Sequence, residues 1–431
     1  MKQKLNIFQY VLDNSIEFEI SDPQYRNGYQ FKNQELTFRE GYIEFNPELI
    51  KPISRLEPSH KNIEELFLAL YEGAPQNIKD SLKEYDKFYF TLLVAILEKD
   101  SNRITELEEI YTNFISQGKG FAELRAPIYK IGLDKPFNIS YDRNHEIEFT
   151  FSSLQDIERA YMDNAGQLPF LSNKELPSLS IIIRGSFDEN KQNLHQDIIH
   201  KLIIVLTLTG NGAAYSNSQE QWFSSGFGGW RAFRKSNTSY GSPRYVLTNN
   251  HKNFLEDNLT KILKGLNLCA LYENKSITPT SVAYENYIES LNATNIFKRA
   301  AFAVMGLEAI LTNKSSEISY SLQLKGTLLA NILWGKNTDY HKNLLKKAYA
   351  IRSDYAHGNT NREKRLKGIE QRSFTFFLQE LLRSLILTNV LEQGNLDFDA
   401  LTDASLLKDF RSSQKLSSSL KRVGSLLSNL N

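Results

Sequence analysis

The chain has 431 residues, of which 41% are hydrophobic and 23% are charged, values that are usual for a folded protein. The 51 Lys and Arg residues nearly balance the 50 Asp and Glu residues, so overall charge does not indicate binding to nucleic acid or to an anionic membrane. The single Cys269 excludes an intramolecular disulfide and a cysteine-rich zinc site. This length exceeds what one hydrophobic core usually supports, which predicts two or three domains.

The N-terminus does not have the long apolar segment and small-residue cleavage site of a secretory signal. The strongest apolar run, Leu202 to Leu208, is too short to span a bilayer. We therefore expect a cytoplasmic protein.

The N-terminal half mixes strand and helix patterns. Aromatic and β-branched residues alternate with polar ones from Ile16 to Phe45, which predicts a small antiparallel sheet. After Pro58, helical spacing predicts two or three helices to about Gln117. A strand is expected at Glu146 to Phe151, followed by a helix to about Asp163 that begins with a capping box, either Ser152 with Gln155 or Ser153 with Asp156.

Residues 178 to 250 read as rich in β-structure. The predicted strands are SLSIIIRG, KLIIVLTLTG and PRYVLT. Between the last two lies a glycine-rich stretch, Trp222 to Trp230, which is either a ligand-contacting loop or a hairpin with aromatic packing. Basic residues beside this stretch weakly favour binding to nucleic acid or to an acidic partner; they are Arg231, Arg234 and Lys235.

Strand patterns end near residues 272 to 281, where we place a domain boundary. Three helices are expected to end near Asn313, at Leu333 and at Ala356, with Thr338 or Asp339 capping the third and Gly358 as its left-handed C-cap. A capping box, Thr360 with Glu363, opens a fourth that runs to Gly394. The expected fold is an α+β region of antiparallel strands with helices, residues 1–275, followed by an all-α bundle, residues 276–431.

The C-terminal tail has apolar residues at alternating spacings of four and three, with basic residues between them. This pattern fits either a short coiled-coil seam or a basic helix that packs against the bundle. The apolar positions are Leu416, Leu420, Val423, Leu427 and Leu430, and the basic ones are Lys415, Lys421 and Arg422.

The chemically most informative stretch is AYAIRSDYAHG, which ends at Gly358 and places Arg352 and His357 five positions apart. Arginine donates to phosphate oxygens, and histidine exchanges protons near neutral pH. Together they suggest phosphate-ester chemistry. The spacing alone is unspecific, because Arg55 and His60 repeat it around Pro58, where a regular helix is excluded.

In an unbroken helix, two side chains five positions apart diverge by roughly 140°. Arg352 and His357 would converge only if the last helical turn unwinds, which Gly358 would permit. The alternative is a structural role, in which both side chains bind a backbone carbonyl or a carboxylate at the helix end.

Three segments together resemble a HEPN domain, and most closely the Apea-like HEPN group, over about residues 282 to 395. They are AFAVMGLEAILTN from Ala301, LQLKGTLLANILWG from Leu322 and LKKAYAIRSDYAHG from Leu345. Many HEPN proteins have Asn, Asp or His directly after the arginine, whereas this chain has Ser353 and then Asp354. For residues 1–275 the resemblance implies a sensor or regulatory region, as in bacterial anti-phage proteins.

The resemblance implies metal-independent RNA cleavage without a cofactor. His357 would transfer the proton of the ribose 2′-OH, and Arg352 would stabilise the pentacoordinate phosphate, giving 2′,3′-cyclic phosphate and 5′-hydroxyl ends. HEPN nucleases generally join two such pairs across a two-fold axis, so a homodimer with a composite site is implied. The expected role is abortive infection, with a phage-derived protein as the trigger.

Other residues have supporting roles with open alternatives. Glu308 matches a position where related proteins often have Glu and is expected to orient Arg352, unless it is a surface residue. Tyr355 either stacks on a base or belongs to the core. The basic residues of this region bind the RNA backbone or form a solvated helix face; they include Lys342, Lys346, Lys347, Arg362, Lys364, Arg365 and Lys367.

His195 and His200 lack a carboxylate pattern of metal-ligand type, so we interpret them as structural. A second hypothesis for the whole chain remains open. In it the bundle is a non-catalytic HEPN module for dimerisation or RNA binding, and the N-terminal region carries the function.

Overall fold

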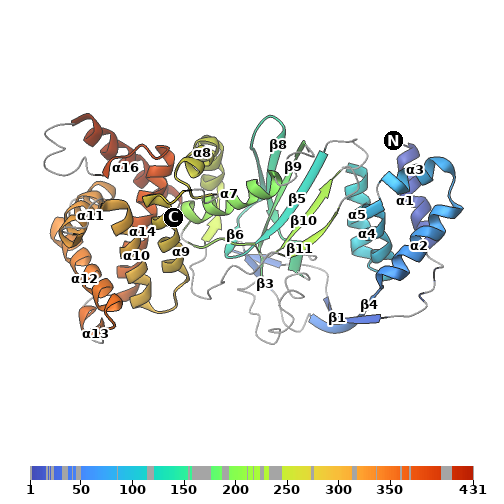
Figure 1. Cartoon of the computed structure of the whole chain (residues 1–431), viewed down its shortest axis with the longest axis horizontal. Helices are drawn as coiled ribbons and strands as arrows, with labels where there is room; N and C mark the ends of the chain where they lie inside the picture. The colour runs from blue at the N-terminus through green and yellow to red at the C-terminus, as the bar shows by residue number, and fades with distance from the viewer. Residues whose placement is uncertain are drawn as a thin grey trace. The chain divides into compact units, whose positions relative to one another are not determined.

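A computed structural model gives the fold of the chain. It describes residues 2–15, 18, 20, 24–31, 37–40, 42–44, 50–84, 86–113, 121–153, 156–157, 176–186, 194–210, 212–216, 218–223, 228–232, 245–272, 276–312, 318–335, 337–359, 362–367, 370–398 and 410–430. The described part is a mixture of helices and antiparallel strands in the N-terminal half and helices in the C-terminal half (Figure 1). This confirms the expected order of an α+β region and a helical region.

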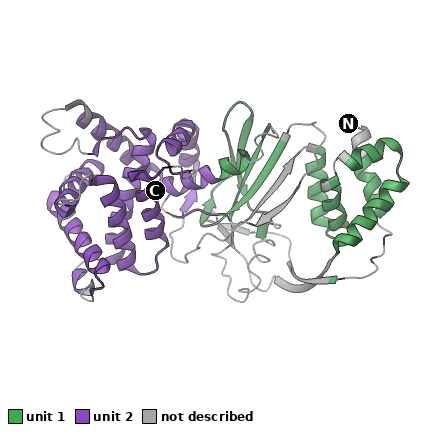
Figure 2. Cartoon of the chain, in the orientation of Figure 1, with its two compact units in different colours: residues 1–199, 216–234 green, residues 200–215, 235–431 purple. Residues whose placement is uncertain are grey.

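The chain forms two compact units, and the division differs from the predicted boundary at residue 275. One unit comprises residues 1–199 and 216–234, and the other comprises residues 200–215 and 235–431 (Figure 2). We call them the mixed unit and the helical unit. Helix α8 (Asn249–Leu268), which the predicted boundary assigns to the first region, therefore belongs with the C-terminal helices.

The mixed unit contains a helical layer around its own apolar core. The sequence predicted two or three helices after Pro58, and the structure has four there, preceded by a helix for which we drew no expectation. Buried Phe8, Leu66, Phe88 and Tyr111 are among the residues that hold the layer together. The helices are α1 (Lys2–Ser15), α2 (His60–Gly73), α3 (Gln76–Glu84), α4 (Asp86–Leu97) and α5 (Ser101–Asn113).

The mixed unit also contains a six-stranded sheet in the order β11-β10-β5-β9-β8-β7, in which each pair of neighbours is antiparallel. Strand β9 is central and its apolar residues are buried, whereas Arg184 at its end binds Glu123 of β5 at 2.6 Å and also Glu148 of β8. The strands are β5 (Phe121–Ile128), β7 (Phe137–Ser140), β8 (His145–Phe151), β9 (Leu179–Ser186), β10 (Ser218–Phe223) and β11 (Gly228–Ala232).

The strands near the N-terminus form two short pairs. Strands β1 (Gln24–Phe31) and β4 (Ile50–Glu57) pair antiparallel, as do β2 (Thr37–Arg39) and β3 (Tyr42–Glu44). Of the two capping boxes proposed after β8, the box of Ser153 with Asp156 is present, because the backbone N–H of each residue donates to the side chain of the other; Gln155 of the alternative box lies outside the described residues. The expected helix to Asp163 lies outside the described residues.

The prediction of a strand at KLIIVLTLTG is wrong, because this segment is the second half of helix α7 (Leu194–Thr209). Leu202, Val205, Leu206 and Leu208 are all fully buried, so the helix has no polar face in this half. A fully buried apolar run has the same pattern in a helix and in a strand. The predicted strand PRYVLT contains β12 (Tyr245–Leu247), and the predicted SLSIIIRG is β9.

The helical unit is built on α14 (Gln371–Leu391), whose residues are almost all buried. It is surrounded by α8, α9 (Pro279–Asn292), α10 (Ile296–Leu311), α11 (Ile318–Trp334), α12 (Thr338–Ala356) and α16 (Phe410–Leu430) (Figure 1). By length and composition α14 is also the one described helix that could cross a membrane, but 89% of its apolar window is buried within the protein. That is the setting of a core helix.

Three helix starts differ from expectation. The segment that leads to the helix end expected near Asn313 forms two helices, α9 and α10, which are separated at Ala293, and Asn295 caps the second. The long fourth helix starts at Gln371, with the Glu370 carboxylate accepting the backbone N–H groups of Arg372 and Ser373. The predicted box at Thr360 and Glu363 lies outside the residues whose side chains are described. Helix α12 has Asn337 as its N-cap in place of Thr338 or Asp339.

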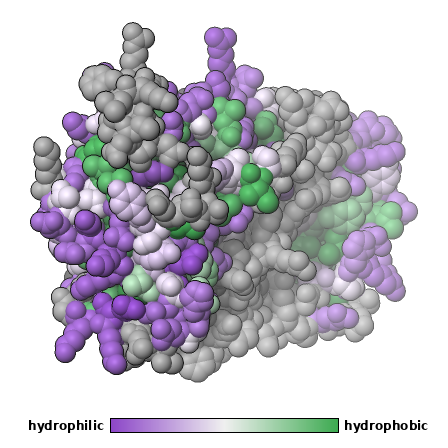
Figure 3. All heavy atoms as spheres, turned by 60° about the vertical axis from the view of Figure 1, so that its left-hand side comes forward, coloured by the Kyte–Doolittle hydropathy of each residue, from purple (hydrophilic) through white to green (hydrophobic). Residues whose placement is uncertain are grey.

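The C-terminal helix α16 packs against the bundle, as the second of the two interpretations of the tail predicted. Its apolar residues Leu416, Leu420 and Val423 are buried, and Gly424 lies so close to α11 that an added Cβ would be 3.2 Å from the Leu333 oxygen. The surface that comes forward in Figure 3 is mainly hydrophilic, with separate hydrophobic patches.

Candidate active site

The helix end that carries the candidate site has a complete C-terminal cap. His357 is the C-cap of α12, and Gly358 has a φ of +67°, the left-handed conformation predicted for it. The Gly358 N–H donates to the Tyr355 oxygen at 3.3 Å, and the Asn359 N–H donates to the Asp354 oxygen at 2.8 Å. These two bonds define a Schellman motif, which gives the backbone after His357 one defined path.

Helix α12 does not unwind before the histidine. The His357 N–H still donates to the Ser353 oxygen at 3.0 Å, so the last turn is intact. Arg352 and His357 therefore diverge by roughly 140° around the helix axis. The unwound last turn that would have let the two side chains converge is not found, because Gly358 acts after the histidine and not before it. One chain offers the two groups on different sides of one helix end.

Arg352 is held by Glu308 of the neighbouring helix α10. Arg352 Nη2 lies 2.9 Å from Glu308 Oε2, and the side chains are 28% and 11% exposed. The burial of Glu308 excludes the interpretation of a surface glutamate. Burial raises the pKa of Glu308, and the attraction of Arg352 only partly opposes this effect. The ion pair thus joins α10 to the end of α12.

The contact between Arg352 and Glu308 does not use all of their bonding capacity. Arg352 Nε and Glu308 Oε1 are buried and have no hydrogen-bond partner among the described residues. The guanidinium is therefore anchored through one of its terminal nitrogens instead of by a two-bonded fork. The Arg352 side chain as a whole is still 28% exposed.

His357 is exposed, and its imidazole makes no hydrogen bond or ion pair with any described residue. Neither Arg352 nor His357 is buried in the core, so both can meet a ligand. A structural role predicts a bound carboxylate or carbonyl for each of them. That expectation is met for Arg352 and not for His357.

Asp354 is a structural residue. It is 6% exposed, and its carboxylate accepts from Arg365 Nε at 3.1 Å and from Asn359 Nδ2 at 3.2 Å. It thereby ties the short helix α13 (Arg362–Arg365) and the Schellman loop to α12 (Figure 1). Ser353 is half-buried and contributes its backbone oxygen to His357. The polar neighbour of the pair is thus Glu308, and Asp354 is engaged elsewhere.

The remaining predicted residues divide into packed and exposed groups. Half-buried Tyr355 lies against Phe302, with ring centroids 6.3 Å apart, which favours the interpretation of a core tyrosine. Lys346 is exposed and Lys347 is half-buried, whereas Arg365 is occupied by Asp354. The Arg362 side chain lies outside the described residues.

The structure also describes parts of two other segments that the sequence singled out. The stretch Trp222 to Trp230 includes the end of β10 and the start of β11, which pair antiparallel with Trp222 opposite Gly228, as the interpretation of a hairpin predicted. His195 is 3% exposed, and burial lowers its pKa to about 4, as expected for a structural histidine. His200 lies against Tyr272. Among the described residues, no three His, Cys, Asp or Glu side chains are grouped in a way that could hold a metal ion.

Comparison of the chain with models of known protein families found no match, and comparisons with curated proteins and with solved structures found none either. The geometry of the site and the resemblance of its motifs are therefore what a functional assignment rests on.

Proposed function

We propose that this chain is a HEPN-type endoribonuclease that acts in the cytoplasm in bacterial abortive infection. The observation that supports the proposal most is the pairing of an anchored arginine with an unoccupied histidine at one capped helix end. Arg352 is fixed by Glu308 and remains partly exposed, while His357 projects into solvent beside a Schellman loop.

The chemistry needs a base and a positive charge. In the proposed reaction, His357 takes the proton of a ribose 2′-OH, and the 2′-oxygen attacks the adjacent phosphorus. The bond to the 5′-oxygen breaks, and a protonated histidine returns a proton to the leaving oxygen. Arg352 stabilises the additional negative charge on the phosphate through its exposed donors. The products are a 2′,3′-cyclic phosphate and a 5′-hydroxyl.

The divergence of the two side chains supports a composite site. One helix end presents Arg352 and His357 in different directions, so we propose that two copies of the chain face one another, with the groups of both lining one RNA-binding cleft. The exposed Lys346 provides positive charge for the RNA backbone on the same helix.

The test is cleavage of labelled RNA by the purified full chain in the presence of a chelator. Arg352→Ala and His357→Ala are each expected to lower the rate by about 10²–10⁴-fold. Arg422→Ala is the matched control, because Arg422 binds Glu392 at 2.7 Å in the same unit and forms a similar arginine–glutamate pair. Cleavage by both site variants at the control rate would overturn the proposal.

Two further measurements address assembly and triggering. If the site is composite, mixing Arg352→Ala with His357→Ala subunits restores part of the activity that each variant has lost. In bacteria that express the chain, a panel of phages should include one whose infection arrests growth, and the Arg352→Ala/His357→Ala double variant should abolish that arrest. Continued growth of infected cells that express the wild-type chain, with an intact RNA pool, would contradict a role in defence.

A non-catalytic HEPN module is the second candidate, and the Arg352–Glu308 ion pair is the observation that favours it, because a purely structural arginine would make the same contact. It predicts RNA binding or dimerisation that the two alanine variants leave intact, with no cleavage products at any protein concentration.

A further inference from the structure

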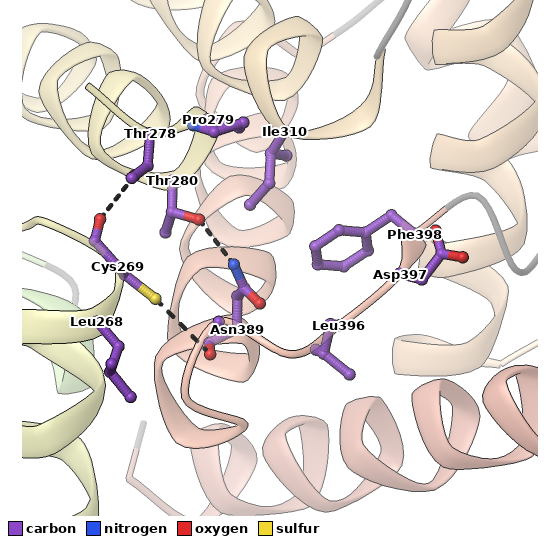
Figure 4. A pocket seen from close by; sticks show the side chains of 11 residues that line it. Leu268, Cys269, Thr278, Pro279, Thr280, Ile310, Asn389, Leu396, Asp397 and Phe398 are labelled. Carbon is purple, nitrogen blue, oxygen red and sulfur yellow. Dashed lines mark hydrogen bonds between the residues drawn. The ribbon is translucent and has the colours of Figure 1, made fainter. Parts of the chain in front are cut away.

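The helical unit contains a pocket of about 280 Å³ that lies apart from the candidate active site. It is lined by the C-terminal end of α8, the N-terminal end of α9, the last turns of α10 and α14, and the segment that follows α14 (Figure 4). Ile310 lines it from α10, two positions after Glu308. Residues two positions apart lie about 200° apart around a helix, so the pocket and Arg352 are on opposite sides of α10.

One side chain in the pocket has an unused polar atom. Asn389 is 7% exposed, and its Nδ2 donates to Thr280 Oγ1 at 2.7 Å. The Cys269 thiol, beside Thr280, donates to the backbone oxygen of Asn389 at 3.9 Å. Asn389 Oδ1 is left buried without a hydrogen-bond partner among the described residues. Figure 4 shows this oxygen directed away from Thr280, toward Phe398 and Leu396.

A buried carbonyl oxygen without a partner costs free energy unless a donor binds to it. The other pocket walls define what kind of donor would fit. Leu268, Ile310, Leu396 and the ring of Phe398 provide apolar and aromatic contact, and Asp397 adds a carboxylate at the rim. None of the described lining residues is Lys, Arg or His. The pocket lining therefore favours a ligand that has an N–H donor and carries no negative charge.

We propose that this pocket binds a small planar aromatic molecule that carries an amino or amidine group, with the group bound to Asn389 Oδ1 and the ring against Phe398. The volume is just below the range of pockets for drug-sized ligands and suits one or two fused rings. Burial raises the pKa of Cys269 to about 11, so its thiol stays protonated and serves as an uncharged wall of the pocket.

Ligand-observed NMR on the full chain tests the proposal, with probes that differ in the donor group. The probes are 2-aminopyridine, adenine and benzamidine, with pyridine and benzoate as matched rings that lack the donor. We expect saturable binding of the amino and amidine probes and at least about fivefold weaker binding of pyridine, the effect of one lost hydrogen bond. Benzoate should not bind.

Two variants localise the binding. Leu396→Trp fills the half-buried rim without touching Asn389 or Thr280 and should abolish binding of all probes. Asp397→Asn removes the charge of an exposed carboxylate and should weaken binding of benzamidine more than binding of 2-aminopyridine. Lys421→Ala, at an exposed position of α16, is the control. Absence of saturable binding by all three donor probes up to about 10 mM overturns the proposal. Binding that survives Leu396→Trp, or benzoate binding as well as benzamidine, overturns it too.

Discussion

Glu308 Oε2 lies 2.9 Å from Arg352 Nη2 and joins the last turn of α10 to the C-terminal end of α12. The pair is partly desolvated, and burial rather than the ion pair decides the pKa of Glu308, which is raised. A carboxyl whose pKa is higher in the folded state binds protons more tightly there. Its ionisation therefore removes stability as pH rises above the unfolded value near 4.5.

The Glu308→Gln variant tests the effect of the ion pair on folding stability and its effect on RNA cleavage separately. The amide keeps an acceptor for Arg352 and removes the desolvated charge, so this variant should be at least as stable as wild type at neutral pH. Its stability should also fall less as pH rises from acidic values. Cleavage of RNA should drop about 10–100-fold, because the guanidinium is held less firmly. Urea unfolding at several pH values and single-turnover cleavage check both parts. Reduced stability with unchanged cleavage would make the pair structural.

Arg365 and Lys346 should behave differently, although the sequence placed both in one RNA-binding group. Arg365 is half-exposed and bound to Asp354, so a double-mutant cycle of Arg365→Gln and Asp354→Asn should give a coupling of about 0.5–1 kcal/mol in unfolding free energy. Lys346→Gln should instead lower the slope of log affinity for RNA against log salt by about 1. If Arg365→Gln lowers that slope as much, Arg365 contacts RNA as well.

Gly265 and Gly358 should tolerate alanine to different degrees, for different reasons. A Cβ on Gly265 would lie 1.9 Å from the Val390 oxygen, where α8 crosses α14, so Gly265→Ala should cost about 3 kcal/mol through displaced backbone. Gly358 has open space around it and a φ of +67°, so Gly358→Ala should cost only about 1 kcal/mol. Gly358→Asn should recover part of this loss. Thermal unfolding of the three variants measures the order.

His251 should contribute to the loss of stability in acid. Its Nδ1 accepts the Thr248 N–H at 3.2 Å, and burial, with a smaller effect of Arg383, lowers its pKa to about 4. The unfolded state binds the proton first, so stability is complete above about pH 6.5 and falls as pH decreases toward about 4. By about pH 5 the expected loss is about 2 kcal/mol.

His251→Asn tests this contribution, because asparagine keeps an acceptor for Thr248 and does not titrate. The unfolding free energy of this variant should decline less between neutral pH and about pH 5 than that of the wild type. His60→Asn, at an exposed histidine, is the control. An unchanged acid dependence in His251→Asn would show that other groups dominate.

Local signals in the sequence predicted much of the helical unit. The periodicity of its helices, the glycine at position 358 and the apolar stripe from Leu416 to Leu430 each depend on residues close in sequence, and each is found. The prediction of a strand at residues 201–210 is wrong. In a fully buried segment almost every residue is apolar, so the sequence does not show the periodicity that distinguishes a helix from a strand. The sequence did not predict that the long helix starts at Gln371. Its N-cap, Glu370, is a less distinctive signal in a sequence than the capping box expected at Thr360 and Glu363.

Contacts between distant residues could not be inferred from periodicity. The Glu308–Arg352 pair was expected only through resemblance to a family, and the pocket around Asn389 was not predicted. Its parts come from Cys269, Thr280 and Asn389, which lie on three separate helical segments. The nearest signal was the segment 272–281, which we interpreted as a domain boundary and which contains Thr278, the N-cap of α9.

Arg383 is fully buried and donates to the Thr209 oxygen at 3.0 Å, across 174 positions of sequence. An expression fragment limited to residues 276–431 would remove this acceptor, together with the packing of Gly265 on Val390. It would leave a guanidinium in an apolar interior with Glu380 as its remaining described partner. We therefore do not expect the C-terminal helices to fold as an independent unit. A recombinant helical unit has to include α7 and α8.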